Sequence, residues 1–255
     1  METVGIIAAM SQERAALLRF VEGVERIAIG RFRCQRFRLF ERDCWLLTSG
    51  MGVKRATQAA HTLTETISPQ LLISVGVAGA VNDDLEIGDV INARRFFLME
   101  NGVPGPFQPL ALLSEAARQT VAQALQPRRA RFLSGTAITT HGSQFVQRQP
   151  GELENPILEM ETAGIARVSA EEDIPLLSLR AISDGPHAPI PFDLEKIMDE
   201  EYNLHIDRIF KIILGHPQLL MRFLRLARNT RQAAENVAIA LIAALSQPGP
   251  VISEK

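Results

Sequence analysis

Short apolar runs alternate along this chain with segments of helical periodicity. Residues 4–9, 71–75 and 176–182 are almost entirely hydrophobic, as strands buried on both faces of a sheet are. Helices are expected between and after these runs, the first with Ser11 as its N-cap: residues 12–21, 53–66, 114–125, 162–170 and 218–245. This order of elements predicts an α/β fold, a three-layer α/β/α sandwich with a mixed central β-sheet.

Further patterns add strands and loops to this picture. Residues 31–40 and 44–48 flank a polar turn at 41–43 and predict a β-hairpin, and shorter strands are expected at 87–91 and 131–134. The stretch 101–109 holds two glycines and three prolines, which indicates a loop. Residues 185–192 carry three prolines and form a candidate lid over a site.

The composition limits the class of protein. A chain of 255 residues with 46% hydrophobic content is able to bury one large core. A net charge of −2 with interspersed acids and bases argues against a nucleic-acid partner. Cys34 and Cys44, without a nearby histidine cluster, indicate neither a disulfide framework nor a zinc site, and no metal or cofactor is expected. The sequence has no secretion signal and no apolar run of about 18 residues, so we expect a cytoplasmic protein.

Acidic residues lie at the end of an apolar segment near the middle of the chain. Glu159 and Glu161 stand two positions apart, so their side chains project from one face if residues 157–163 are extended, with Met160 on the other face. Paired acids at a strand end suit acid–base chemistry or the binding of sugar hydroxyls.

A third acid, Asp184, follows the strand expected at 176–182. Only Ser178 and Arg180 interrupt the apolar pattern of that strand. Ligands of open α/β sheets bind where parallel strands end, which makes Asp184 a candidate site residue. The alternative is structural: a helix N-cap, a surface acid and an ion pair with Arg180.

Six short motifs follow one another between about positions 4 and 184. They are Gly5-Ile6-Ile7-Ala8-Ala9-Met10 with Glu13, Ser49-Gly50-Met51-Gly52, Gly76-Val77-Ala78-Gly79, Ile87-Gly88-Asp89-Val90, Glu159-Met160-Glu161 and Arg180-Ala181-Ile182-Ser183-Asp184. This ordered set resembles the purine nucleoside phosphorylase and uridine phosphorylase superfamily. Within it, the set is most similar to the hydrolytic branch, the methylthioadenosine/S-adenosylhomocysteine nucleosidases.

The resemblance implies a role for each acid in breaking a ribosyl N-glycosidic bond. Asp184 is implied to be the general acid that protonates N7 of the purine, in a pocket dry enough to keep it protonated. Glu161 is implied to bind the ribose 2′ and 3′ hydroxyls, and Glu13 to activate water with the help of Arg180. The other residues implied to line the substrate are Met160, Glu159, Gly76, Val77, Ala78, Ile138, Thr139 and Ser183.

Departures from the family patterns bear on the nucleophile and the substrate. The chain lacks the amino-terminal Gly-Asp-Pro-x-Arg pattern of the hexameric phosphorylases, and it reads Ser74-Val75-Gly76-Val77 where they resemble Arg-Val-Gly-Ser. A phosphate site needs such groups, so water is the expected nucleophile. Val77 replaces the serine that the nucleosidases use to hold that water, and Ile138 replaces their aromatic wall.

The carboxy-terminal region, residues 215–255, is expected to be a basic helical extension packed on the catalytic domain at 1–214. Its arginines recur every three residues, at Arg222, Arg225, Arg228 and Arg231, with apolar residues on the other side. Such a helix either lies on an anionic membrane surface or packs on the domain with a solvated arginine face. The hopanoid-associated phosphorylase-like proteins resemble the chain here and in the Gly-x-Ala-Gly turn, which implies an adenosyl lipid such as adenosylhopane.

The function expected from these observations is hydrolysis of a 5′-substituted, hydrophobic purine nucleoside with release of adenine. Three alternatives stay open: a phosphate-dependent nucleoside phosphorylase, a futalosine-type hydrolase that releases hypoxanthine, and a non-catalytic nucleoside-binding protein. The resemblance also implies a homodimer or a higher homo-oligomer.

Overall fold

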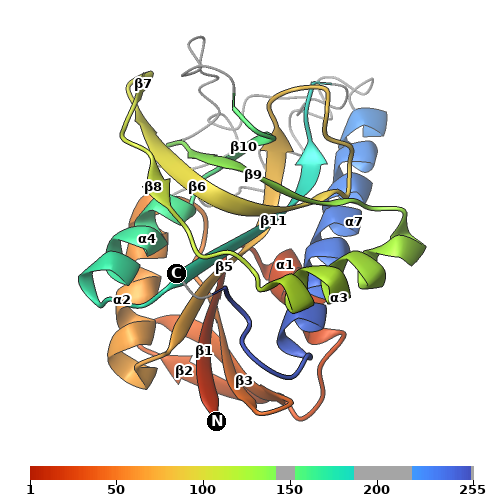
Figure 1. Ribbon diagram of the computed structural model, residues 1–255. Helices are drawn as coiled ribbons and strands as arrows, with labels where there is room; N and C mark the ends of the chain where they lie inside the picture. Colours follow the sequence, from red (N-terminus) through yellow and green to blue (C-terminus); the bar gives the residue numbers. More distant parts are fainter. Residues whose placement is uncertain (142–152, 187–219, 254–255) are drawn as a thin grey trace.

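A mixed β-sheet lies between two layers of helices in the computed structural model, which describes residues 1–141, 153–186 and 220–253 (Figure 1). The sheet order is β10-β9-β6-β11-β5-β1-β4-β3-β2, and the short strands β7 and β8 pair with β6. The predicted α/β/α sandwich with a mixed sheet is confirmed.

The described strands vary from two residues to eleven. They are β1 (Glu2–Ala8), β2 (Glu25–Ile29), β3 (Phe32–Leu39), β4 (Arg42–Thr48), β5 (Leu71–Ala80), β6 (Val90–Glu100), β7 (Val103–Pro104), β8 (Gln108–Pro109), β9 (Phe132–Thr139), β10 (Pro156–Glu159) and β11 (Leu176–Asp184).

The described helices separate most of these strands along the chain. They are α1 (Ser11–Leu18), α2 (Val53–Ile67), α3 (Glu115–Leu125), the 3₁₀ turn η1 (Gln126–Arg128), α4 (Thr162–Glu171) and α7 (Leu220–Leu245). Helices α2 and α4 cover one face of the sheet, and α1, α3 and α7 cover the other (Figure 1).

The centre of the sheet is parallel. Strand β1 runs parallel to β4 and β5, and β5 runs parallel to β11, so the carboxyl ends of β1, β5 and β11 meet at one edge. On its other side β11 pairs antiparallel with β6. The sequence motifs that follow the three parallel strands are therefore brought together, although they lie far apart along the chain.

Helix α7 changes character along its length. Its first residues are exposed, whereas Ala233, Val237, Leu241 and Leu245, spaced four apart on one face, are almost completely buried. These side chains belong to the same hydrophobic cluster as the β1, β5 and β11 residues Ile6, Ile73 and Leu179. The carboxyl half of α7 is thus part of the main core.

Several predicted boundaries need correction. Ser11 is the first residue of α1 rather than its cap, which is Met10. The segment 157–163 is not extended throughout: β10 ends at Glu159, and α4 begins at Thr162. Ser11 and Thr162, polar residues that also suit the position just before a helix, are here the first residues of helices.

The sheet is also larger than expected. Strand β2 was not predicted, β6 continues to Glu100 and β9 to Thr139, and the stretch 101–109 contains β7 and β8. Their sequences mix arginines and glycines with apolar residues, which weakens a period of two. The candidate lid lies outside the described residues from position 187 onward.

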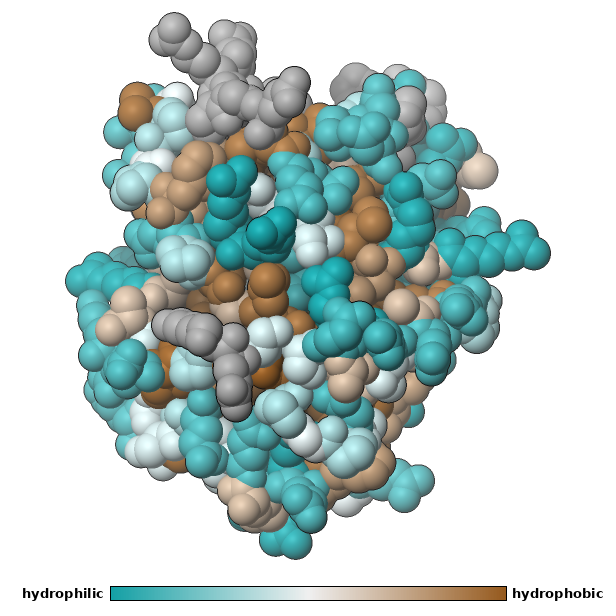
Figure 2. Space-filling model, viewed as in Figure 1, coloured by the Kyte–Doolittle hydropathy of each residue, from teal (hydrophilic) through white to brown (hydrophobic). Residues whose placement is uncertain are grey.

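Within the described residues, no helix is long and apolar enough to cross a membrane. In the space-filling view from the same side, hydrophilic residues predominate around the rim, and hydrophobic residues show between them nearer the middle (Figure 2).

Candidate active site

Two glycines of β5 make room for two carboxylates. A Cβ atom added to Gly76 would lie 2.6 Å from Oε1 of Glu13, and one added to Gly79 would lie 2.8 Å from Oδ2 of Asp184. Real Cβ atoms do not come so close to other atoms, so each acid occupies space that only glycine leaves free. The Gly76-Val77-Ala78-Gly79 motif therefore has a steric purpose, which is to let Glu13 and Asp184 reach the strand.

Glu13 is held in place by backbone amides. Its Oε2 accepts a hydrogen bond from the Met10 N–H at 2.8 Å, and its Oε1 accepts one from the Val77 N–H at 3.0 Å. The residue is 5% exposed. Desolvation by burial raises the pKa of Glu13, and the two amide hydrogen bonds and the charge of Arg180 only partly oppose this shift. A raised pKa suits a base that must take a proton near neutral pH.

Asp184 ends β11 on the other side of β5. Its Oδ1 accepts a hydrogen bond from the Ser183 hydroxyl at 2.6 Å. Burial raises the pKa of Asp184, and the Ser183 hydrogen bond opposes that shift. A carboxyl group with a raised pKa keeps its proton at higher pH, as a general acid requires.

The two acids meet β5 three residues apart. Strand geometry separates Gly76 from Gly79 by about 10 Å. Because the side chains of a regular strand alternate between its two faces, glycines three positions apart receive the two acids at separate positions along β5.

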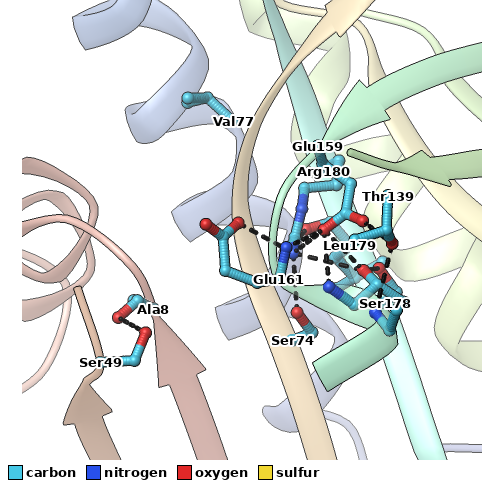
Figure 3. A network of polar contacts seen from close by, with 12 residues as sticks. Ala8, Ser49, Ser74, Val77, Thr139, Glu159, Glu161, Ser178, Leu179 and Arg180 are labelled. Atoms are coloured by element: carbon cyan, nitrogen blue, oxygen red, sulfur yellow. Dashed lines mark hydrogen bonds and ion pairs between the residues drawn. The ribbon is translucent and has the colours of Figure 1, made fainter. Parts of the chain in front are cut away.

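A buried ion pair supports the site from beneath. Nη2 of Arg180 donates to Oε2 of Glu159 at 2.9 Å, and the two side chains are 1% and 0% exposed (Figure 3). The same nitrogen donates to Ser74 Oγ at 2.7 Å. Burial disfavours the charged form of Glu159, but Arg180 and several hydrogen-bond donors hold the pKa of this carboxyl below its usual value.

Glu159 also joins β10 to α4. Its Oε2 accepts hydrogen bonds from the Glu161 N–H at 3.0 Å, the Thr162 N–H at 2.8 Å and the Thr162 hydroxyl at 2.8 Å, while Oε1 accepts one from Thr139. All these partners belong to the protein. The geometry favours the structural alternative for Glu159, a helix-capping ion-pair partner, because these groups already engage both oxygen atoms of its carboxylate.

Glu161 stands beside this network with a less complete set of partners. Its Oε1 accepts a hydrogen bond from the Gly52 N–H at 3.0 Å, and its Oε2 lies 3.8 Å from Nη2 of Arg180. Burial, together with the negative charge of Glu159, raises the pKa of Glu161 to about 7, against the opposing charge of Arg180. The Ser49-Gly50-Met51-Gly52 turn thus meets the Glu159-Met160-Glu161 motif.

The remaining predicted residues differ in their surroundings. Val77 and Met160 are half-buried, and Ser183 is buried beside Asp184. Ala78 is buried, and its carbonyl oxygen accepts a hydrogen bond from Ser183 at 3.4 Å. Ile138 is 1% exposed in a cluster of hydrophobic residues from β6 and the end of β5.

Residues that sequence reasoning missed complete the network. Ser74, Thr162 and Ser178 are buried hydroxyl groups, and the Thr162 and Ser178 hydroxyls lie 3.3 Å apart. A polar residue inside an apolar strand was the available signal for Ser74 and Ser178, because a buried hydroxyl requires a partner. Within the described residues, Arg180 Nε has no hydrogen-bond partner.

No group of three or more His, Cys, Asp or Glu side chains within the described residues is arranged to hold a metal ion.

The fold and these paired acids define a known class of protein. The profile of the Phosphorylase superfamily matches residues 3–214, and the chain belongs to that superfamily. Within it, the chain is similar to the 5′-methylthioadenosine/S-adenosylhomocysteine nucleosidases, so the predicted nucleosidase-like branch is confirmed.

Named relatives support this likeness, and solved structures share the fold. The nucleosidase of Oceanobacillus iheyensis is 29% identical over 219 residues, covering 75% of this chain and 90% of its own. The Neisseria meningitidis nucleosidase solved with methylthio-immucillin-A has a TM-score of 0.69 at 18% identity and covers 96% of this chain and 99% of its own. The structure of a futalosine hydrolase mutant of Helicobacter pylori has a TM-score of 0.67 at 18% identity, covering 95% and 98%. At these identities the solved structures show the shared fold.

Proposed function

We propose that this protein hydrolyses the N-glycosidic bond of a purine nucleoside. The observation that carries the proposal is the pair of carboxyl groups, Glu13 and Asp184, held against β5 where Gly76 and Gly79 make room for them. The motifs shared with the nucleosidases, and the relatives that bear that name, support the same activity.

Each acid has one proton to move. Asp184 donates its proton to the departing purine as the bond between the base and C1′ of the ribose breaks. Glu13 accepts a proton from the water whose oxygen forms the new bond to C1′. The products are the free base and the free sugar, and because the developing cation at C1′ is short-lived, acid and base act in the same event.

Glu161 binds the ribose in this proposal, and Arg180 helps to position the water. Glu161 accepts hydrogen bonds from ribose hydroxyls through its Oε2, which among the described residues lies 3.8 Å from Arg180 and accepts no hydrogen bond. Arg180, whose charge lowers the pKa of Glu13, helps Glu13 to position the attacking water; within the described residues its Nε has no hydrogen-bond partner.

The charges of the site support water as the nucleophile. Arg180 faces Glu159, Glu161 and Glu13, so its single positive charge is already outnumbered. A phosphate dianion entering here would be repelled by the carboxylates, whereas water is not. The hydroxyl of Ser74 is also engaged with Arg180.

We propose a 5′-substituted adenosine with a hydrophobic substituent as the substrate and adenine as the product. Relatives named as methylthioadenosine and S-adenosylhomocysteine nucleosidases support the adenosine portion. The futalosine hydrolase fold supports a second candidate, a nucleoside that releases a different base.

A single panel of substrates tests these assignments. Purified protein is incubated with methylthioadenosine, longer 5′-alkyl adenosines, adenosine and the matching inosines, with and without phosphate, and the free base is identified by chromatography. We expect adenine release that is independent of phosphate and fastest with apolar 5′ groups. Turnover only in the presence of phosphate would establish a phosphorylase, and tight adenine binding without turnover would establish a binding protein.

We also propose that the start of α7 contacts an anionic membrane. Leu220, Met221 and Leu224 are 44%, 70% and 56% exposed, and Arg222 and Arg225 are exposed beside them. Apolar side chains next to arginines suit the boundary between lipid headgroups and acyl chains.

Co-sedimentation with vesicles tests this contact. We expect binding to vesicles that contain phosphatidylglycerol and weaker binding to pure phosphatidylcholine. Replacing Leu220, Met221 and Leu224 together by serine should abolish the binding, whereas Phe40→Ser, which removes an apolar side chain that is 69% exposed elsewhere, should not. Equal binding by both variants would contradict the proposal.

We propose finally that the protein forms a homodimer or a higher homo-oligomer. Val103 of β7 is 66% exposed and Phe107, just before β8, is 42% exposed, so this part of the molecule presents apolar surface that a second subunit would cover. Light scattering coupled to gel filtration gives the mass. A monomer at all concentrations would contradict the proposal.

A further inference from the structure

Arginines surround a groove beside the amino-terminal half of the sheet. Two open cavities of about 510 and 640 Å³ adjoin there, and Arg14, Arg31, Phe32 and Arg33 line both. Arg55 also lines the cavity of about 510 Å³, and Arg26 also lines the cavity of about 640 Å³. These arginines come from α1, from β2, from the β2–β3 turn, from β3 and from α2. We call the groove the arginine pocket.

The arginine pocket is strongly positive. Five arginines line it, and none of its described lining residues is an aspartate or glutamate. Nearby arginines behave differently: Arg36 pairs with Asp43 at 2.8 Å, and Arg42 pairs with Glu2 at 2.9 Å. Within the described parts of the chain, Arg14, Arg26 and Arg33 have no ion-pair partner, so the positive charges of these three arginines are not offset by an ion pair there.

One of these arginines, Arg31, is held in place, and a second, Arg55, lies close to the backbone. The guanidinium of Arg31 stacks over the ring of Phe32, 5.2 Å from its centroid, and donates a hydrogen bond to Gln58 of α2. Arg55 lies across Gly50, where an added Cβ would be 2.7 Å from its Nη1. Guanidinium groups ordered in this way lose less freedom when they bind an anion.

Neighbouring groups add to the preference for an anion. Ser11, the first residue of α1, lines the smaller cavity, and the positive end of the helix dipole lies there. The larger cavity is partly apolar, because Leu18, Ile27 and Ala28 line it beside Phe32. The pocket therefore has a charged end and an apolar end.

We propose that the arginine pocket binds a phosphate-bearing small molecule, with its phosphoryl groups between Arg14, Arg31, Arg33 and Arg55 and its remaining part over Phe32 and Ile27. Planar guanidinium groups match the oxygen atoms of phosphate in pairs, which favours phosphoryl groups over carboxylates. A combined volume of this size accommodates a ligand as large as a nucleotide.

This site is separate from the candidate active site. None of Glu13, Glu161 and Asp184 lines the arginine pocket. The two sites are nevertheless neighbours, since the turn that contributes Ser49 and Gly50 to the pocket continues to Gly52, whose N–H donates to Glu161. The proposal does not depend on the reaction catalysed.

Titration of the full-length protein with inorganic pyrophosphate, followed by calorimetry at constant ionic strength, tests the proposal. We expect one saturable site in the wild type. The double variant R31S/R33S should weaken the affinity by about tenfold or more, because each lost hydrogen bond joins two charged groups. Both arginines are exposed, so this variant is expected to keep its thermal unfolding temperature.

The matched control is Arg38→Ser, which removes an exposed arginine of the same strand, β3, that does not line the pocket. It should bind pyrophosphate like the wild type. Absence of saturable binding, unchanged affinity in R31S/R33S, or an equal loss in the Arg38→Ser control would each overturn the proposal. Sulfate that binds as tightly as pyrophosphate would overturn the assignment to phosphoryl groups.

Discussion

Arg180 and Glu159 form an ion pair 2.9 Å long although their side chains are 1% and 0% exposed. Two charges at this depth lose their hydration, so they are retained only where their attraction and further hydrogen bonds compensate. The pair links β11 to the end of β10, and its two charges act on Glu161 in opposite directions: Glu159 raises the pKa of Glu161, and Arg180 lowers it. Its removal should affect both stability and the site.

Breaking this pair from either side should be costly. We expect Arg180→Met or Glu159→Met to lower the free energy of unfolding by about 3–5 kcal/mol, because each leaves one buried charge unpaired. The double variant should be more stable than either single one. Urea unfolding of all four proteins gives the coupling energy, and strictly additive losses would show that the pair does not act as a unit.

Asp184→Asn should abolish the general acid without altering the shape of the site. For the proposed hydrolysis we expect the kcat to fall by about 10²–10⁴-fold with a small change in KM. Steady-state adenine release from methylthioadenosine measures both constants. Ser183→Ala is the companion variant: it removes a hydrogen bond that lowers the pKa of Asp184, so the acid stays protonated and most activity should remain.

Adding one methyl group to β5 should displace each acid separately. Gly76→Ala places a Cβ 2.6 Å from Glu13 Oε1, and Gly79→Ala places one 2.8 Å from Asp184 Oδ2. We expect both variants to lose most activity, since a small misplacement of a reacting group costs about 100-fold. In Gly105→Ala the new Cβ meets the backbone of Leu98, its carbonyl oxygen at 3.1 Å and its nitrogen at 4.0 Å, and neither acid, so activity should persist there. Full activity in Gly76→Ala would exclude Glu13 as the base.

Stability should fall as the pH rises toward neutrality. The pKa of Glu161 is raised from 4.5 to about 7, so the folded state binds its proton more tightly than the unfolded state does. This contribution is complete below pH 4.5 and is lost as the pH rises to about 7, at up to about 1.4 kcal/mol per pH unit. The raised pKa values of Glu13 and Asp184 act in the same direction.

The Glu161→Gln variant tests how much of this pH dependence comes from Glu161 rather than from Glu13 and Asp184. The amide carries no charge at any pH, so the variant should lose part of the decline and exceed the wild type in stability above pH 7. Denaturant unfolding from pH 5 to pH 8 measures the slope. An unchanged slope in the variant would contradict the assignment. Glu159, whose pKa is lowered, contributes stability that is fully present above its usual pKa and is lost only as the pH falls below it, so it adds no slope between pH 5 and pH 8.

Arg42 should be a main anchor of the carboxy-terminal region. The buried guanidinium donates to the carbonyl oxygens of Leu245 at 2.7 Å and Gln247 at 2.9 Å, and also to that of Gly249. Arg42→Met should lower the free energy of unfolding by about 3 kcal/mol, since it leaves several carbonyl groups without partners. The exposed Arg38→Met is the control, with an expected change within about 0.5 kcal/mol.

Much of the architecture followed from local patterns. The apolar runs that became β1, β5 and β11, and the helical periods of α2, α3 and α4, were predicted because burial on two faces or on one stripe leaves a clear period. The strands β2, β6 and β9 were missed or shortened. Their edges and arginines break the period, and they are stabilised by pairing with other strands, β2 with β3 and β6 with β9, rather than by their own composition.

The candidate active site was also predicted only in part. The motifs named Glu13, Glu161, Arg180 and Asp184 as candidates, and the structure holds Glu13 and Asp184 beside the glycines that the same motifs contain. Spacing alone did not separate Glu159 from Glu161. The Glu159 carboxylate binds Arg180 and the backbone at the start of α4. Oε2 of Glu161, by contrast, lies 3.8 Å from Nη2 of Arg180.

By itself the sequence determined the superfamily, the order of elements and the types of residue that carry chemistry, because these depend on neighbours along the chain. Only the tertiary structure decided which acid is buried in an ion pair, how far each pKa moves and where five arginines come together. The physical reason is that desolvation and charge interaction depend on distances between segments that lie far apart in the chain.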